Sequence, residues 1–562
     1  MGDLTKIIPP ASLSDADRLT IFNHVFRRLA ATRNTAELYA MAEGDVSGRS
    51  SPPESNSSGT MALFVLEVDL WVQSILSAAW IACREPGGGD CPTLDPLSDS
   101  STGDLPTLPA APLIEKTVNS ILFLHITTTK SYSARSRAFL SQFGTLDERA
   151  ISTTLKDPDA ALKAASVQVD ATKAQYAKHG RALRAVGMGV GAVAGGVLIG
   201  VTGGLAAPLV GAGVSAVFGA LGLGGTAVGL LAGGLASSSV VCGALFGAYG
   251  ARSTARMVER HTKEVRDLAV VPVRPPQETL ALRLCVSGWL GTQDDVIAPW
   301  TVFEGDDTFA LQWEVEALEA LSSALSTLVK AQAMRYVKAQ IIKHTFFASL
   351  MSSLAPLAWL QIGRIIDNPW TNTKALAIKT GAVLADLLVN RAFGERPITL
   401  TGYSLGALVI FTALSHLAEL PPARTAHLVQ DVFLFGAPVP SDPHAWAVVR
   451  RVVAGRLVNG YGAEDYVLAV LARASDASWG VAGLQAIEVM GVDNVEIVEV
   501  DGHLRWAGMV GKALVKCGAP GVRKGEAEKR AEDARREAEK ETSRDEAESV
   551  LKEGPTGKPD EQ

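Results

Sequence analysis

Apolar residues recur at helical spacing through the first 180 residues of the chain. Positions three and four apart fall on one helical face in three stretches, residues 13–43, 61–83 and 113–180. Two stretches rich in Ser, Pro, Gly and Asp separate these helices, at residues 44–60 and 84–112. We therefore expect residues 1–180 to form a helical region with two disordered linkers.

The segment that follows these helices contains no charged residues. Between Arg184 and Arg252 lie 67 residues without a charged side chain, and 20 of them are glycine. This length exceeds the roughly 20 residues that cross a bilayer, and glycines recur every fourth residue, as at Gly187 and Gly191, which lets helices approach closely in lipid. Basic flanks on both sides favour an even number of crossings. We expect a transmembrane hairpin over residues 181–255, although a buried hairpin in a soluble protein fits the same pattern.

From about residue 279, short apolar runs alternate with helical stretches. Six strands are predicted, at Leu282–Ser287, Phe309–Trp313, Ile398–Thr401, Val429–Phe435, Arg456–Asn459 and Val495–Val500. This alternation is typical of a mostly parallel sheet with helices on both faces. The uncharged stretch Thr345–Gly363 lies between two of these strands, which favours a buried or lid helix over a third crossing. The pattern predicts an α/β domain over residues 270–518.

Composition and charge limit the possible functions. The net charge of −7 argues against nucleic acid as a partner, and the five cysteines are far apart with no metal-ligand spacing. We find no Walker-type loop and expect no cofactor. The N-terminus lacks the pattern of a cleaved signal peptide. The tail, residues 519–562, is rich in charge without an apolar heptad repeat, so we expect a disordered or solvated helix that could bind protein partners.

The pentapeptide Gly402-Tyr403-Ser404-Leu405-Gly406 is the strongest chemical signal. It follows a predicted strand and precedes a predicted helix, which is the context of a G-x-S-x-G nucleophile turn. In such a turn the serine hydroxyl is lifted above the sheet, and the next backbone N–H points at the oxyanion that forms during acyl transfer. We therefore predict Ser404 as the nucleophile and the Leu405 N–H as an oxyanion donor.

A serine needs a histidine base and an acid that orients it, in the chain order Ser, acid, His. His503 follows the last predicted strand, and we prefer it to His416, His427 and His444. Asp465 follows the predicted strand Arg456–Asn459 and is our choice of acid; it could also cap a helix, and Asp442 is its rival.

A second oxyanion donor should come from the loop after an early strand. Gly288 and Trp289, directly after Leu282–Ser287, are the candidates. Cys285 lies within that apolar strand and is expected to be a core residue.

Several separated motifs resemble one known family. They are Ile366–Trp370, Ile398–Ala407, Val432–Pro440, Val453–Asn459, Gly483–Gln485 and Gly502-His503. In this order they resemble the transmembrane and coiled-coil domain-containing protein 4 family, over about residues 180–515, and the chain looks like a fungal-type member. The resemblance implies an α/β-hydrolase fold, membrane association and a triad of Ser404, Asp465 and His503. The tail departs from it by lacking coiled-coil periodicity.

Together these patterns predict a membrane-bound serine hydrolase. Its partners would be the lipid bilayer and a lipid or other acyl-ester substrate, and the catalytic domain would face the cytosol. The alternative is a catalytically silent hydrolase fold that serves as a scaffold or trafficking module at a membrane.

Overall fold

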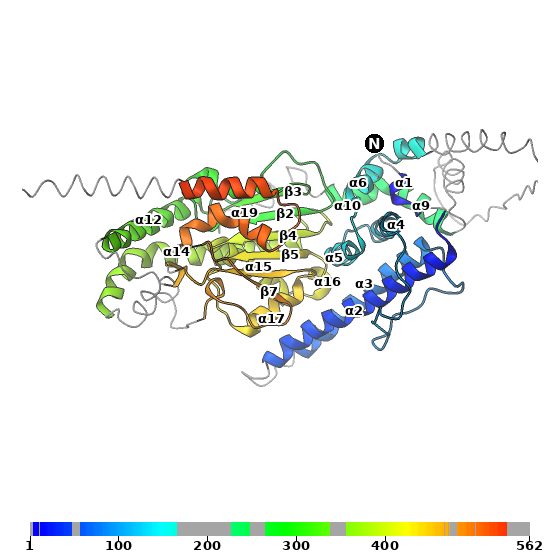
Figure 1. Ribbon diagram of the computed structural model, residues 1–562, viewed down its shortest axis with the longest axis horizontal. Helices are drawn as coiled ribbons and strands as arrows, with labels where there is room; N and C mark the ends of the chain where they lie inside the picture. The colour runs from blue at the N-terminus through cyan, green and yellow to red at the C-terminus, as the bar shows by residue number, and fades with distance from the viewer. Residues whose placement is uncertain are drawn as a thin grey trace, which may run out of the picture. The chain divides into compact units, whose positions relative to one another are not determined.

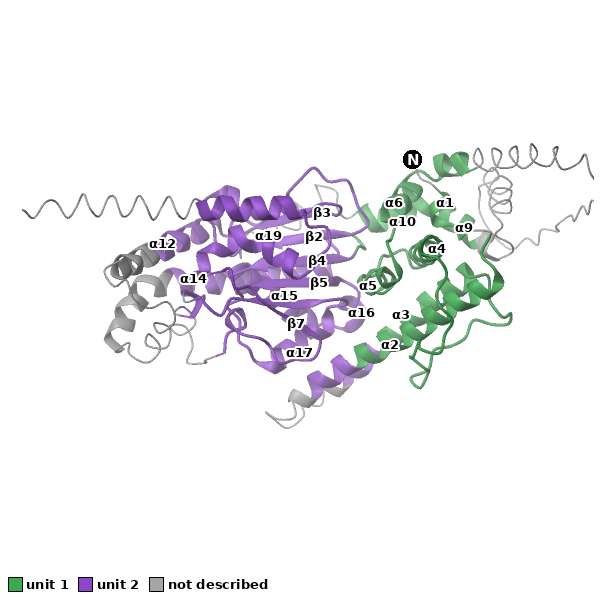
Figure 2. Ribbon diagram, in the orientation of Figure 1, with its two compact units in different colours: residues 1–37, 66–248, 394–396 green, residues 38–65, 249–393, 397–562 purple. Residues whose placement is uncertain are grey.

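A computed structural model describes most of the chain (Figure 1). The described residues are 4–9, 12–47, 57–165, 226–247, 265–337, 356–465, 467–469, 471, 480–500 and 502–536. They fall into two compact units (Figure 2). Unit 1 comprises residues 1–37, 66–248 and 394–396, and unit 2 comprises residues 38–65, 249–393 and 397–562.

The described part of unit 1 consists of helices and loops. Its helices are α1 (Leu4–Ile7), α2 (Asp15–Ser47), α3 (Ser57–Ala82), α4 (Ala111–Thr129), α5 (Ala134–Leu140), η1 (Ser141–Phe143), α6 (Glu148–Lys156), α9 (Thr226–Ala236) and α10 (Ser238–Phe246), with the end of α2 and the start of α3 assigned to unit 2. Helix α4 is buried along consecutive residues such as Ile121, Leu122 and Phe123. Residues 117 to 127 are buried without a break, so every side of this part of α4 is covered and it lies in the core of unit 1. Of the predicted helical region, the described residues up to 165 contain helices α1 to α6, and residues 166–180 lie outside the described part.

Residues 83–110 differ from the expectation of a disordered linker. The Gln73 side chain of α3 donates to the carbonyl of Pro92 at 3.2 Å and accepts from the Leu94 N–H at 3.4 Å. The His24 ring of α2 lies 2.8 Å from the Pro106 carbonyl. The segment is therefore a folded loop, because polar side chains of two helices satisfy its backbone. Of the other predicted linker, residues 48–56 lie outside the described part, and α2 and α3 include its two ends.

The predicted transmembrane hairpin is described only over residues 226–247. There, α9 and α10 bury Leu231, Leu235, Val241 and Leu245 and pack against α4 and α6. The rest of residues 181–255 lies outside the described part. One helix of the described residues is long and apolar enough to cross a membrane, Gly59–Ala82. The apolar pattern of residues 61–83 predicted a helix there, but not a membrane crossing.

Unit 2 is built around a seven-stranded sheet. Its strands are β1 (Ala269–Pro272), β2 (Leu282–Val286), β3 (Asp307–Gln312), β4 (Ile398–Tyr403), β5 (Val429–Phe435), β6 (Leu457–Tyr461) and β7 (Val492–Glu496), in the order β1-β3-β2-β4-β5-β6-β7. Only β1 runs antiparallel to its neighbour. The predicted α/β class with a mostly parallel sheet is confirmed.

Two strands differ from the prediction. β1 was not predicted, and β7 begins and ends earlier than Val495–Val500. Val498, which the apolar pattern placed inside the strand, is 62% exposed. A half-exposed edge strand lacks the continuous apolar run that marks a central strand, so its limits are weakly encoded.

Helices cover both faces of the sheet (Figure 1). They are α12 (Val315–Val337), α14 (Pro356–Val389), α15 (Leu405–Glu419), α16 (Pro422–Thr425), α17 (Pro443–Val452), α19 (Trp506–Lys516), and the short turns η3 (Gln293–Val296), η4 (Ala298–Val302), η5 (Ala482–Leu484) and η6 (His503–Arg505). α14 and α17 pack on α15, whose Ile410 approaches Gly402 of β4. α19 packs on β5 from the other face, where Trp506 stacks on Phe435.

Two predicted segments, Thr345–Gly363 and the charged tail of residues 519–562, are described only in part. Residues 338–355 lie outside the described part, and residues 356–363 begin α14. Within the tail, residues 524–536 form a helix whose Ala527 and Ala531 are buried against unit 2. Gly511 of α19 accommodates the Ala527 side chain, so small residues let the first part of the charged tail join the core.

Candidate active site

Ser404 occupies a strained turn between β4 and α15. Its backbone has φ 52° and ψ −129°, a conformation that side chains rarely adopt. The Ser404 N–H donates to the carbonyl of Phe435 in the neighbouring strand at 2.9 Å, which helps to hold the turn. The hydroxyl is thereby fixed at the carboxyl end of a central strand.

The glycines around Ser404 are required by close packing. A β-carbon at Gly402 would collide with Ile410 and Gly406. A β-carbon at Gly406 would overlap the carbonyl of Val286 in β2. The turn therefore fits between two strands and its own helix only because both positions lack side chains.

Three residues from three strand ends form one chain of hydrogen bonds. The Ser404 Oγ lies 2.5 Å from the His503 Nε2, and the His503 Nδ1 lies 2.7 Å from the Asp465 Oδ2. Ser404 follows β4, Asp465 follows β6, and His503 begins η6 after β7. Parallel strands end at a common edge of the sheet, so residues far apart in sequence meet there. Each of the three residues is 1% exposed or less.

The hydrogen-bond partners determine the histidine tautomer. An ionised carboxylate only accepts hydrogen bonds, so the proton of the imidazole is assigned to Nδ1, which faces Asp465. The His503 Nε2 is then free of a proton and accepts from the Ser404 hydroxyl. This is the arrangement in which a histidine can remove a proton from a serine.

The Asp465 carboxylate has two further donors. The Leu468 N–H donates to Oδ1 at 3.0 Å, and the Trp506 indole N–H donates to Oδ2 at 3.0 Å. Asp465 therefore caps a helical turn and also contacts His503, so the two interpretations that the sequence left open are compatible. Trp506 was missed by sequence reasoning, although its position three residues after His503 placed both on one helical face.

The predicted oxyanion donors lie against each other. A β-carbon at Gly288 would meet the Tyr403 carbonyl, the Leu405 nitrogen and the Gly406 nitrogen. Among the described residues, neither the Leu405 N–H nor the Gly288 N–H has a hydrogen-bond partner. Two unpaired backbone donors beside the Ser404 turn are available to an oxygen of a bound substrate. Trp289, the other loop candidate, likewise has no hydrogen-bond partner for its N–H among the described residues, while its carbonyl accepts from the Tyr403 hydroxyl at 3.1 Å.

Two tryptophans fix the loop that carries Gly288. The Trp300 indole donates to the Ser287 hydroxyl and the Trp313 indole to the Ser287 carbonyl, both at 3.1 Å. Neither was singled out from the sequence. Cys285 is fully buried in β2, and burial raises the pKa of its thiol. It is a core residue, as expected, because a thiol of this kind is a poor nucleophile.

The residues that were weighed against Asp465 and His503 have other positions in the fold. Asp442 caps α17 by accepting from the Ala445 N–H at 2.9 Å. His416 lies on α15 with its ring 3.6 Å from Glu419. His427 precedes β5, and His444 lies in the first turn of α17. Among the described residues, no contact joins any of these four to Ser404, and no group of three potential ligands gathers to hold a metal ion.

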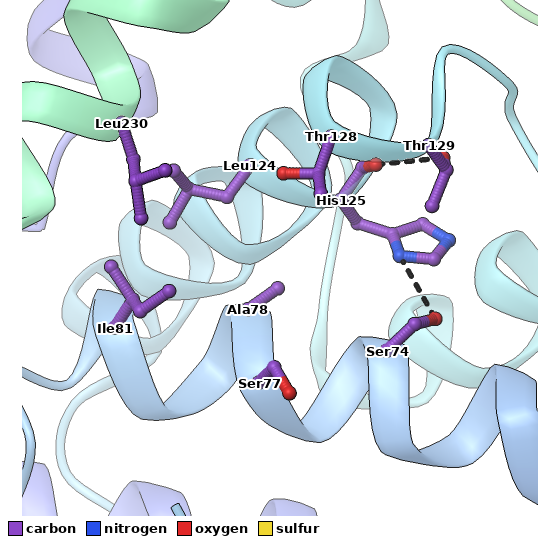
Figure 3. Close-up of a pocket in the computed structure, with 9 residues that line it drawn as sticks. All are labelled: Ser74, Ser77, Ala78, Ile81, Leu124, His125, Thr128, Thr129 and Leu230. Atoms are coloured by element: carbon purple, nitrogen blue, oxygen red, sulfur yellow. Dashed lines mark hydrogen bonds between the residues drawn. The ribbon is translucent and has the colours of Figure 1, made fainter. Parts of the chain in front are cut away.

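Unit 1 contains a separate pocket of about 340 Å³ (Figure 3). It lies between α3, α4 and α9, and its lining residues are Ser74, Ser77, Ala78, Ile81, Leu124, His125, Thr128, Thr129 and Leu230. The ring of His125 lies 3.5 Å from the Ser74 hydroxyl and 2.9 Å from that of Ser136. No carboxylate lines this pocket, so it does not repeat the arrangement around Ser404.

The chain is similar in sequence to a protein family and to several proteins of other organisms. A family model described as "Protein of unknown function (DUF726)" matches residues 180–519. An uncharacterized membrane protein of Schizosaccharomyces pombe is 37% identical over 59% of this chain. A rice protein (Oryza sativa subsp. japonica) named transmembrane and coiled-coil domain-containing protein STS1 is 35% identical over 56%. A Saccharomyces cerevisiae protein named probable lipase MIL1 is 37% identical over 53%.

The aligned part of the chain spans 58%, 49% and 27% of these three relatives, less than two thirds in each case. No solved structure matches the chain. The resemblance stated from the sequence is thus supported at the level of the family.

Proposed function

Since the chain belongs to the DUF726 family of proteins of unknown function, we propose its activity from the candidate site: it is a serine hydrolase of the α/β-hydrolase fold that cleaves an acyl ester. The observation that carries this proposal is the hydrogen-bonded chain from Ser404 through His503 to Asp465, at 2.5 and 2.7 Å. The chain order Ser, Asp, His supports the hydrolase fold. So does the turn between β4 and α15, where a strained serine precedes a helix.

In the proposed reaction, the Ser404 Oγ attacks the acyl carbonyl while the His503 Nε2 takes the hydroxyl proton. Asp465 keeps the imidazole in the required tautomer and stabilises the imidazolium that forms. The tetrahedral intermediate collapses, and His503 protonates the departing alcohol. Water then attacks the acyl-enzyme by the same route and releases the acid.

Backbone donors stabilise the negative oxygen of both intermediates. The Leu405 N–H and the Gly288 N–H are our candidates, because both are unpaired and adjacent. Trp289 remains the second candidate for the loop donor. Removing one donor of such a pair typically costs about 10²–10³ in rate.

We propose a lipid ester as the substrate and a membrane as the location. The name of the yeast relative, probable lipase, supports the first. The names of the fission-yeast and rice relatives, together with the apolar helix Gly59–Ala82, support the second. The basic flanks of residues 181–255 favour a cytosolic catalytic domain. Resistance to carbonate extraction and protease access to unit 2 from the cytosolic side would support this topology; release by carbonate or lumenal protection would contradict it.

A fluorophosphonate probe tests the activity without knowledge of the substrate. The wild-type protein should be labelled, and S404A should not. S415A is the matched control, because Ser415 lies on α15 and donates only to the Phe411 carbonyl within its own helix. Labelling that survives S404A rejects Ser404 as the nucleophile. A folded wild-type protein that resists labelling favours the alternative of a catalytically silent scaffold.

A further inference from the structure

Trp506 shares an acceptor with the candidate base. Its indole N–H donates to the Asp465 Oδ2 at 3.0 Å, and the His503 Nδ1 contacts the same oxygen at 2.7 Å. His503 begins η6, and Trp506 begins α19 directly after it. A spacing of three residues places both side chains on one face of a helical turn. One turn of the backbone therefore aims two donors at one carboxylate oxygen.

The position of the indole is fixed from several sides. Trp506 is fully buried and stacks on Phe435, with ring centroids 6.0 Å apart and 28° between the planes. Gly436 has φ +52°, and a β-carbon there would collide with the indole nitrogen. A β-carbon at Gly462 would lie in van der Waals contact with the indole Cζ2, at 3.5 Å. The close approach of Gly436 and the stacking on Phe435 hold the ring with its N–H toward Asp465.

The hydrogen bond from the Trp506 indole stabilises the ionised form of the Asp465 side chain. The Asp465 carboxylate has three donors, from His503, Trp506 and Leu468, and donors to a carboxylate favour its charged form. Among the described residues, the remaining partner of His503 is Ser404. Asp465 and His503 are thus the titratable groups in direct contact. Removing the indole donor would concentrate negative charge on Oδ2 and make the pair easier to protonate.

We propose that Trp506 is a positioning residue of the Ser404 site, which holds the Asp465 carboxylate in line with His503 through its indole N–H. A role of Trp506 in catalysis rests on the proposed function. The effect of Trp506 on the Asp465–His503 pair rests on the geometry alone. Among the described residues, Trp506 has a hydrogen bond to Asp465 and none to Ser404, so it acts through Asp465.

The test is W506F in the full-length protein, measured as the second-order rate of fluorophosphonate labelling across pH. The acid limb of the wild-type profile should move upward by about one pH unit in W506F, the size expected for one lost hydrogen bond to a charged group. W446F is the matched control. Trp446 is also fully buried and packs on an aromatic ring, that of Phe411 at 5.0 Å, but its indole donates to the Pro440 carbonyl. The acid limb of W446F should overlie that of wild type.

The deciding readout is the pH midpoint. An unshifted acid limb in W506F overturns the proposal, even if the rate falls at every pH, because a uniform fall is what lost packing produces. Where W506F does not fold, 3-benzothienylalanine at position 506 keeps the ring shape and removes only the N–H, and the same shift is expected. If wild type is not labelled at all, the proposed function fails separately. The ¹³C titration of His503 in wild type and W506F then decides: a raised midpoint in the variant supports the inference, and equal midpoints reject it.

Discussion

The α-carbon of Gly288 packs against the backbone nitrogen of Leu405, so closely that any β-carbon at position 288 would overlap it. Two loops that are more than a hundred residues apart thus meet backbone to backbone beside Ser404. Such contact sets the spacing between two N–H donors, and an oxyanion site depends on that spacing.

G288A should therefore disable the site. The new methyl group meets backbone atoms that cannot rotate away, so one loop must shift and the pair of donors separates. We expect fluorophosphonate labelling to slow by about 10²-fold or more. The control is G291A in the same loop, where a β-carbon would meet only the Asp295 side chain, at 3.1 Å. Equal labelling of G288A and wild type would exclude this loop as an oxyanion donor.

D465N should lower the labelling rate by about 10⁴-fold, the scale of a histidine held in the wrong tautomer. The amide offers an N–H where the His503 Nδ1–H needs an acceptor, which favours a proton on Nε2 and blocks transfer from Ser404. D442N is the matched control, since Asp442 caps α17 and asparagine is an equally good cap. A labelling rate that falls more in D442N than in D465N would reverse our choice of acid.

The backbone strain at Ser404 should be measurable as stability. S404A keeps a β-carbon at φ 52°, whereas S404G removes the β-carbon that makes this φ unfavourable. We expect S404G to have a free energy of unfolding about 1 kcal/mol above that of S404A, with strain relief partly offset by the greater chain entropy of glycine.

The same pair of substitutions at Ser415, inside α15, should give the opposite sign, because glycine destabilises a helix interior by about 1 kcal/mol. Denaturant titration of the four variants measures both differences. If S404G is no more stable than S404A, the turn is not strained.

An ion pair within unit 2 anchors the end of α2. Arg451 of α17 is 2% exposed, pairs with Glu43 and donates to the Ala418 carbonyl at 2.8 Å. R451A would leave Glu43 without this partner and Ala418 without its donor, and we expect about 3 kcal/mol lower free energy of unfolding.

The control for R451A is D493N, which breaks the pair of Asp493 with Arg456. Both of those side chains are more than 40% exposed, so the change should cost under about 1 kcal/mol. Denaturation curves that rank the two variants the other way would show that the α2 anchor contributes little.

The order of short apolar strands and helices was readable from the sequence because central parallel strands are apolar on both faces. Val429–Phe435 was predicted with its observed limits for this reason. β7 was misplaced because an edge strand is half exposed, and its pattern merges with the following Val498 and Val500. Residues 84–112 were predicted to be a disordered linker. The structure has a folded loop over residues 83–110, because side chains of α2 and α3, which composition does not reveal, bind its backbone.

The sequence by itself determined the turn that carries Ser404. Glycines at 402 and 406 around a serine, between a strand and a helix, encode local geometry, and the chain order of acid and histidine followed from it. Only the tertiary structure decided that Asp465 rather than Asp442 meets His503, that Gly288 packs on Leu405, and that Trp506 completes the carboxylate's partners. The reason is physical: a turn is made by neighbours along the chain, whereas these contacts join the ends of separate strands, and their distances are set by how the whole sheet and its helices pack.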